Sequence, residues 1–265
     1  MKRFFLHAPA IILLTWFALV FISPFLALTP EVISLEHVLQ PPNQTYWFGY
    51  DDLGRSVADR LISGAQTSLL VAFSVVMITL FIGTAVGVVS AWYGGWVDQL
   101  LMRITDVFLA FPGILLAIAM AGLLGPGISN VIIALSVVGW VGFARLARAQ
   151  VLLLRERDHV MAANALGTSQ SRVIWQHLLP LVAAPLIIEA TFSVAGLIIA
   201  EAGLSFLGLG VQAPDASWGS MIRDGAQYLL IAPHLVIIPG IALFSIVMAI
   251  NVLGDQLRDW LDIRT

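Results

Sequence analysis

The sequence predicts an all-α membrane protein with six transmembrane helices and both termini in the cytoplasm. Of its 265 residues, 59% are hydrophobic and only 11% are charged, with a mean hydropathy of +0.94. A soluble globular protein has roughly a quarter charged residues, so this composition excludes one. Long apolar intervals recur along the chain, and each reaches the ~20 residues that a helix needs to cross a bilayer.

The first two apolar intervals are predicted to form one span each. Residues 4–30 follow a basic start like that of a signal peptide, but the apolar run is too long and no small-residue cleavage site follows it. We therefore expect a retained first span. The second interval, 61–97, contains Gly83 and Gly87, whose spacing favours close packing against another helix.

The remaining intervals account for four more spans. Residues 107–144 are too long for a single helix, so the Gly-Pro-Gly sequence at 125–127 is expected to be a tight turn between two spans. Residues 181–203 form the fifth span, which carries Glu189 and Glu201, and residues 225–254 form the sixth.

The distribution of Lys and Arg sets the orientation, because these residues are retained on the cytoplasmic side. If the chain starts inside, ten of its 13 basic residues are cytoplasmic. The three that fall outside are accompanied by seven acidic residues. Both termini and the polar segment between the fourth and fifth spans are therefore predicted to be cytoplasmic. The basic residues placed outside are Arg55, Arg60 and Arg223.

The cytoplasmic segment, residues 155–180, has the pattern of two short helices with a break. Asp158 is expected to cap the first helix, and Gly167 to end it in a left-handed conformation. Thr168 or Ser169 then caps the second helix, and Pro180 marks the return to the bilayer. Because small residues dominate the first helix, its face can approach another surface closely.

Five stretches of this chain have distinctive sequences: FGYDDLGRSVADRLISGAQTSL at 48–69, DVFLAFPGILLAI at 106–118, the segment 155–180, AEAGLSFLGLGVQAPDASWGSMIRDG at 200–225 and NVLGDQLRDWLD at 251–262. These stretches resemble the permease subunits of ABC importers for peptides and nickel, in particular the C-type subunit of dipeptide and oligopeptide systems. They occur in the expected order and cover most of the chain. The resemblance implies the type I importer permease fold.

The importer signature in the cytoplasm is Glu-Ala-Ala, three residues, Gly, nine residues and then Ile-x-Leu-Pro. This chain matches it at Ala162, Ala163, Gly167, Leu179 and Pro180. It departs from the signature where Met161 replaces the acid and His177 the isoleucine. Nearby Glu156 and Asp158 offer a partial substitute for the lost charge. The resemblance implies that this segment is the coupling helix, seated on a separate ATPase.

The resemblance also implies a complex in which this chain is a non-catalytic subunit of the bacterial inner membrane. Its expected partners are a second homologous permease, one or two ATPase subunits and a periplasmic substrate-binding protein. ATP and Mg would be bound by the ATPase subunits, because this chain contains no GxxxxGK[ST] phosphate loop. The expected divisions are 1–30 as the first helix, 31–64 as a periplasmic segment, 65–254 as the transmembrane domain with coupling loop 149–180, and 255–265 as a cytoplasmic tail. Short peptides are the expected cargo, with nickel, glutathione or another small solute as alternatives.

The outward stretch after the fifth span is rich in glycine and aromatic residues. By resemblance it faces the binding protein and the mouth of the translocation path, whereas a plain alternative is a loop that Trp218 anchors in the headgroup region. The two carboxylates of the fifth span face protein or water by default, and they either line the path, where they would attract a peptide amino terminus, or pair with another subunit. The candidate residues are Glu189, Glu201, Phe206, Gly208, Gly210 and Trp218.

Two charged groups near the membrane boundaries have simpler interpretations. The charges between Asp51 and Arg60 are expected to lie on a solvated helix face, with contact to the binding protein as the alternative. Arg103 and Asp106 are expected to form an ion pair at the inner end of the third span.

Other functions compete less well with this hypothesis. A secondary carrier usually needs a buried ion site, and only the two carboxylates of the fifth span are available for one. The segment 155–180 would otherwise be an amphipathic loop on anionic lipid. The chain has no cysteine and its five histidines are scattered, so no metal site is expected. No basic patch interleaved with aromatics indicates nucleic acid, and no catalytic motif indicates an enzyme.

Overall fold

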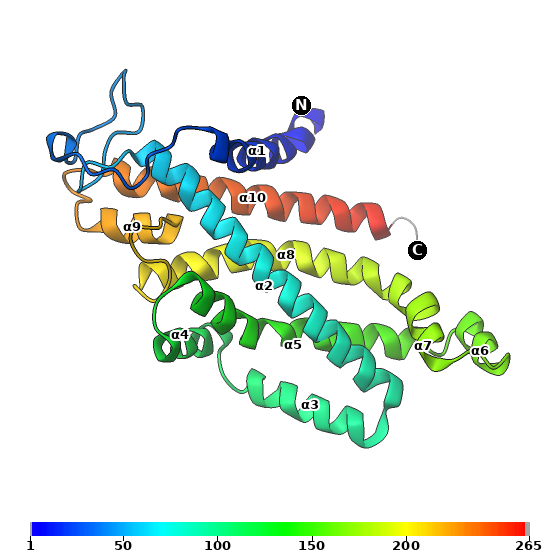
Figure 1. The fold of residues 1–265 in the computed structure, drawn as a ribbon. Helices are drawn as coiled ribbons and strands as arrows, with labels where there is room; N and C mark the ends of the chain where they lie inside the picture. The colour runs from blue at the N-terminus through cyan, green and yellow to red at the C-terminus, as the bar shows by residue number, and fades with distance from the viewer. Residues whose placement is uncertain (1, 263–265) are drawn as a thin grey trace.

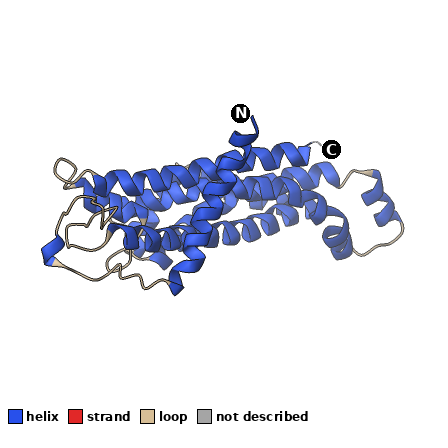
Figure 2. Cartoon of the chain, turned by 90° about the horizontal axis from the view of Figure 1, so that it is seen from above, coloured by secondary structure: helices blue, strands red, loops and turns tan. Residues whose placement is uncertain are grey.

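The computed structural model describes residues 2–262 as an elongated bundle of helices (Figures 1 and 2). The described part of the chain contains helices and loops but no β-strand. Five stretches are long and apolar enough to cross a membrane. They belong to α1 (Lys2–Ile22), α2 (Val57–Tyr93), α5 (Ile128–Leu154), α8 (Leu179–Phe206, continuous with the helical turns from Gln170) and α10 (His234–Asp262).

The sixth span is broken into two helices. α3 (Gly95–Leu109) and α4 (Gly113–Leu124) meet at an angle of 82°. Pro112 lies directly before α4 at the bend, where its missing N–H and fixed φ favour a helix start over a helix interior. The six predicted passes are confirmed when this bent pair counts as one. The third pass starts earlier than predicted. α3 includes Asp98, Arg103 and Asp106, which lie before the apolar interval 107–144.

The turn between α4 and α5 was predicted correctly. Gly125 has φ +85° and Gly127 has φ +136°, backbone conformations that residues with a Cβ rarely adopt. The chain can therefore reverse direction within three residues.

The predicted close packing at Gly83 and Gly87 is confirmed, and the partner helix is α5. A Cβ at Gly83 would collide with the carbonyl oxygen of Trp140, and one at Gly87 with the carbonyl oxygen of Ala144. The two backbones therefore lie in direct contact, and α2 crosses the bundle as its central helix (Figure 1).

Three apolar clusters form the core along the length of the bundle. The first joins the outer ends of α2, α8 and α10 to α9 (Trp218–Ala226), and its members include Leu61, Ile198, Trp218 and Ile246. The second lies between α2, α4, α5 and α8, and includes Val75, Ala121, Leu135 and Leu204. The third, which we call the cytoplasmic cluster, includes Phe143, Val151, Val160, Ala163 and Leu178.

The two ends of the bundle differ in structure. At one end, residues 26–56 and α9 cover the helix ends, whereas at the other α6 (Asp158–Ala165) and α7 (Gln170–Val173) extend beyond the spans (Figure 1). Counting passes from α1 places α6 and α7 on the same side as both termini. They therefore lie at the cytoplasmic end.

Candidate functional site

α6 ends as the sequence predicts, in a left-handed glycine. Gly167 has φ +77°, its N–H donates to the carbonyl of Asn164 at 3.0 Å, and Thr168 N–H donates to the carbonyl of Ala163 at 3.1 Å. This is the Schellman arrangement that satisfies the last carbonyls of a helix. The predicted cap at the other end is wrong. Arg157 occupies the N-cap without a side-chain bond, and Asp158 is the first helical residue, where its charge favours the positive end of the helix dipole.

α6 is held to the bundle by one face and is open on the others. Val160 and Ala163 are buried in the cytoplasmic cluster. Leu166 is 85% exposed and Met161 is 50% exposed. Asp158, Ala162 and Gly167 are exposed as well. The helix therefore presents a small, mainly apolar surface beyond the end of the spans, at the far end of the bundle in Figure 2.

The segment after α6 connects this surface to the fifth span. Ser169 occupies the predicted N-cap position of α7, although its side chain makes no capping bond. α7 continues through a π-helical turn, Ile174–Leu178, into α8. Leu179 is half-buried and Pro180 is exposed in the first turn of α8, so Pro180 does not interrupt the helix. Beyond the turn at residues 166–169, helical backbone therefore runs without interruption from Gln170 into the membrane.

The cytoplasmic ends of the spans are joined by polar contacts. Arg155 donates from Nη1 to the carbonyl of Ala91 at 2.8 Å, which ties α5 to the end of α2. Arg148 donates two hydrogen bonds of 2.6 Å to the carboxylate of Asp98 on α3. Paired N–H groups on one carboxylate fix both position and angle.

The predicted pair of Arg103 with Asp106 is wrong. Asp106 accepts instead from Arg145 on α5 at 2.5 Å, and Arg103 is exposed. Two residues three positions apart on one helix are neighbours, but Asp106 faces the adjacent helix.

At the outer end of the fifth span, Glu201 is completely buried within this chain. Its two carboxylate oxygens accept hydrogen bonds from Ser68 at 2.8 Å and Ser205 at 2.7 Å. Ser205 Oγ also accepts from the N–H of Val211 at 3.1 Å. Glu201 thus links α8 to α2 and supports the loop that follows, and in this structure its carboxylate has no access to a path or to a binding protein.

Glu189 has the opposite environment. It lies in the same helix and is exposed, and within residues 2–262 its carboxylate has no hydrogen bond or ion pair. Both carboxylates lie in the same apolar stretch of sequence. In the fold, Glu201 is buried and Glu189 is exposed.

The outward stretch is more buried than its glycine content indicates. Trp218 has no exposed surface, donates from Nε1 to the carbonyl of Leu61 at 3.1 Å, and packs edge-on against Trp16 with ring centroids 5.1 Å apart. Trp218 is therefore a core residue of the first apolar cluster, at the outer ends of α2, α8 and α10, and not a headgroup anchor. Gly210 is buried against Ser205. Phe206 is 46% exposed and Gly208 is half-buried, so these two candidates remain accessible from outside.

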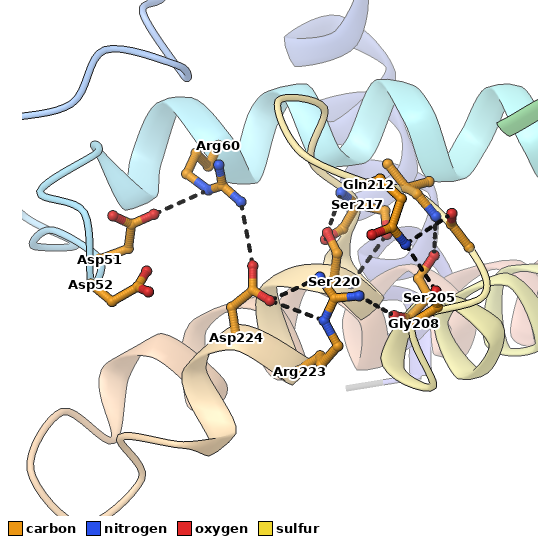
Figure 3. A network of polar contacts seen from close by, with 12 residues as sticks. Asp51, Asp52, Arg60, Ser205, Gly208, Gln212, Ser217, Ser220, Arg223 and Asp224 are labelled. Carbon is orange, nitrogen blue, oxygen red and sulfur yellow. Dashed lines mark hydrogen bonds and ion pairs between the residues drawn. The ribbon is translucent and has the colours of Figure 1, made fainter. Parts of the chain in front are cut away.

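The charges between Asp51 and Arg60 are a buried network, and the predicted solvated helix face is wrong. Arg55 donates from Nε to Asp51 at 2.7 Å, and the Nε of Arg60 lies 3.4 Å from the same carboxylate. Arg60 is 3% exposed and also reaches Asp224 on α9 at 3.9 Å (Figure 3). No pattern in the sequence indicates this partner, because Asp224 lies far along the chain.

The network continues across α9 and has an electrostatic cost. Arg223 contacts Asp224 at 3.0 Å and donates to the carbonyl of Ser205 at 3.4 Å (Figure 3). The pKa of Asp52, beside the network, is raised by burial and then by the neighbouring charge of Asp51. The network therefore clamps the segment before α2 onto α9 and the end of α8.

Comparison with known proteins identifies the family. Residues 83–265 match the family model described as the binding-protein-dependent transport system inner membrane component. The dipeptide transport system permease protein of Alkalihalophilus pseudofirmus is 45% identical over 84% of this chain and 74% of its own length. The glutathione transport system permease protein of Escherichia coli is 43% identical over 83% of this chain and 73% of its own length.

The fold is also found among solved structures. An inward-facing structure of a methionine ABC transporter aligns with a TM-score of 0.61 and 22% identity, covering 75% of this chain and 95% of that one. This likeness confirms the type I importer permease fold. The chain therefore belongs to the family of binding-protein-dependent transport system inner membrane components, and is a multi-pass permease subunit of the ABC importer class.

Proposed function

We propose that this chain forms, with a second homologous permease, the translocation path of an ATP-driven importer for short peptides. One relative named as a dipeptide permease and others named as peptide permeases support the cargo class. A glutathione permease among the relatives supports the main alternative, and glutathione is itself a short peptide derivative. Nickel and other small solutes are the remaining alternatives.

The α6 surface is the observation that carries the proposal. A helix that is anchored by two residues and extends beyond the spans is suited to a contact with a cytoplasmic subunit. We assign ATPase coupling to Asp158, Met161, Ala162, Ala163, Gly167, Leu179 and Pro180. Among these, Met161 and Ala162 supply exposed contact surface, whereas Ala163 anchors the helix. Since Met161 is apolar and unbranched, its contact with the ATPase rests on packing and not on charge.

The ATPase subunits supply ATP and Mg in this proposal, and this chain performs no chemistry. ATP-driven closure of the ATPase pair would move α6 as a rigid body. Because α6 packs in the cytoplasmic cluster and a four-residue turn joins it to α7 and the fifth span, that motion switches the path between inward-open and outward-open states.

The outer end of the chain receives the cargo from a substrate-binding protein. Among the candidate residues of the outward stretch, Phe206 and Gly208 are accessible and form the proposed contact. Glu201, Gly210 and Trp218 support this surface from beneath, since all three are buried.

The test is purification of this subunit in mild detergent with whatever assembles around it. We expect a second permease and ATPase subunits to copurify, and ATP hydrolysis to rise when a peptide-loaded binding protein is added. Parallel assays with binding proteins loaded with glutathione or nickel distinguish the cargoes. A subunit that transports alone, without ATP, would instead be a secondary carrier and would overturn the proposal.

A further inference from the structure

Glu189 is an unpartnered carboxylate inside a membrane span. It lies about 15 Å along the helix axis from Leu179, at 1.5 Å per residue, so it is within the apolar part of α8. An ionised carboxylate exposed to hydrocarbon costs several kcal/mol, and such groups therefore face water or protein. This chain supplies neither a donor nor a cation to it within the described residues. The face of α8 that carries Glu189 therefore does not face lipid in the assembled protein.

Glu201 lies on a different face of the same helix. The two carboxylates are separated by about 120° around α8 at 3.6 residues per turn. Glu201 is satisfied by two serine hydroxyls, whereas Glu189 is open. The buried side of the helix thus faces α2 and the open side faces away from this chain.

The open face continues toward the outer end along small residues. Gly196 and Gly203 follow Glu189 at intervals of about two turns, both are exposed, and a Cβ at either position would meet nothing within 4 Å. Phe206, a proposed contact for the binding protein, lies one turn beyond Gly203 and about 100° around the helix from Glu189. The face of α8 that carries Glu189 is therefore uncovered by this chain and has little side-chain bulk at Gly196 and Gly203.

The opposite side of α8 has different chemistry. Ile187, about 160° around the helix from Glu189, lines a groove of about 840 Å³ between α1, α2, α8 and α10. That groove is lined almost entirely by apolar side chains, among them Phe73 and Val194. The apolar groove is therefore compatible with contact to lipid, whereas the face that carries the Glu189 carboxylate favours contact with water.

We infer that Glu189 faces the aqueous translocation path and pairs there with the protonated amino group of the cargo. The inference rests on the proposed function, because every free peptide and glutathione carries such a group. An α-amino group has a pKa of about 8, so it is cationic at neutral pH and complements the carboxylate. This ion pair would recognise the amino terminus and not the side chains of the cargo. Such recognition is suited to an importer of short peptides with varied sequences.

The first experiment tests whether Glu189 faces water. The chain has no cysteine, so Glu189→Cys and Ile187→Cys each introduce a single thiol into this subunit. In the full complex in lipid vesicles, we expect a membrane-impermeant maleimide to label position 189 and not position 187. Equal labelling of both positions, or none at 189, would overturn the inference.

The second experiment tests the contact with the amino group. With ATP and saturating peptide-loaded binding protein, Glu189→Gln should import a dipeptide about tenfold more slowly than wild type at pH 7, and Glu189→Asp less so. The ratio of the two rates should approach one at pH 9, where the amino group loses its charge. A ratio that does not change with pH would exclude the contact.

Two further outcomes separate this inference from the proposed function. If Glu189→Gln releases the second permease during gel filtration, the carboxylate pairs with that subunit and the inference is wrong. If wild type imports no dipeptide, the proposed cargo is wrong, whereas the labelling at 189 still reports whether this face is aqueous.

Discussion

The hydroxyl of Ser68 on α2 donates to the carboxylate of Glu201 on α8 at 2.8 Å, and both residues are completely buried. This bond joins two helices that are 133 residues apart in sequence. Because both groups are buried, removing Glu201 leaves the Ser68 hydroxyl without this acceptor, and removing Ser68 leaves Glu201 with Ser205 alone. The pair therefore stabilises the packing of α2 against α8 and forms no part of the protein surface.

Replacing Glu201 should accordingly destabilise the subunit. Glu201→Ala leaves two buried serine hydroxyls without an acceptor and opens a cavity, and we expect a loss of about 3 kcal/mol or more. Thermal unfolding of the purified subunit, followed by tryptophan fluorescence, measures it. Ser193→Ala on the same helix is the control, because Ser193 is half-exposed and makes no contact with the pair. Equal midpoints for both variants would contradict the role assigned to Glu201.

Close packing of α2 on α5 makes a second stability prediction. Gly87→Val should destabilise the subunit by at least about 2 kcal/mol, since its side chain would overlap the backbone of Ala144. Gly122→Ala is the matched control, because a Cβ there meets nothing within 4 Å and Ala is the better helix former. The yield of monodisperse protein and its unfolding midpoint should fall only for Gly87→Val.

The left-handed end of α6 predicts a defect in coupling. Gly167→Val forces a β-branched residue into φ +77°, at a cost of about 1–2 kcal/mol per residue, and should change the direction in which the chain leaves α6. We expect the complex to assemble and hydrolyse ATP while cargo uptake falls by about tenfold or more. Gly167→Asn should retain most uptake, because Asn tolerates this conformation. Normal uptake by Gly167→Val would remove the coupling role.

The pKa of Asp52 predicts a pH dependence of stability. Burial raises this pKa, so the folded chain binds the proton more tightly than the unfolded chain does. Stability from this group is therefore present below its ordinary pKa of about 3.9 and is lost as pH rises through the folded pKa. Asp52→Asn should stabilise the subunit at pH 7 relative to wild type, and the difference should shrink toward pH 4. Chemical unfolding at both pH values measures the difference.

Asp51 should behave in the opposite way to its neighbour. Its carboxylate faces the buried guanidinium groups of Arg55 and Arg60, so Asp51→Asn leaves two cations without their main partner. Removing one member of a buried ion pair costs about 3–5 kcal/mol. If Asp51→Asn and Asp52→Asn shift the unfolding midpoint in the same direction, the network does not operate as its geometry indicates.

Local features of this chain were readable from the sequence, and distant partners were not. The turn at residues 125–127, the packing glycine Gly83 and the stop at Gly167 each depend on a residue type and its immediate neighbours. The pair of Asp106 with Arg145 spans 39 positions, and a nearer candidate, Arg103, competed for the same carboxylate. Which charge is satisfied depends on how the helices rotate against each other, and no short pattern in the sequence records that rotation.

The difference between Glu189 and Glu201 was hidden for the same reason. Both are carboxylates in one apolar helix, and their environments follow from the side of α8 that packs against α2. Trp218 is likewise a residue type typical of interfacial anchors. It is buried in the core because α9 packs back between α8 and α10.

The helical stretch from Gln170 to Phe206 has a mechanical consequence. Its 37 residues make a lever arm of about 55 Å that begins next to the exposed α6 surface in the cytoplasm and ends at Phe206 on the outer side. A tilt of about 5° at the α7 end would swing Phe206 by about 5 Å, roughly one helix radius. In the proposed transport cycle, a small displacement in the cytoplasm would therefore be enough to move the outer end of this span by a side chain's width.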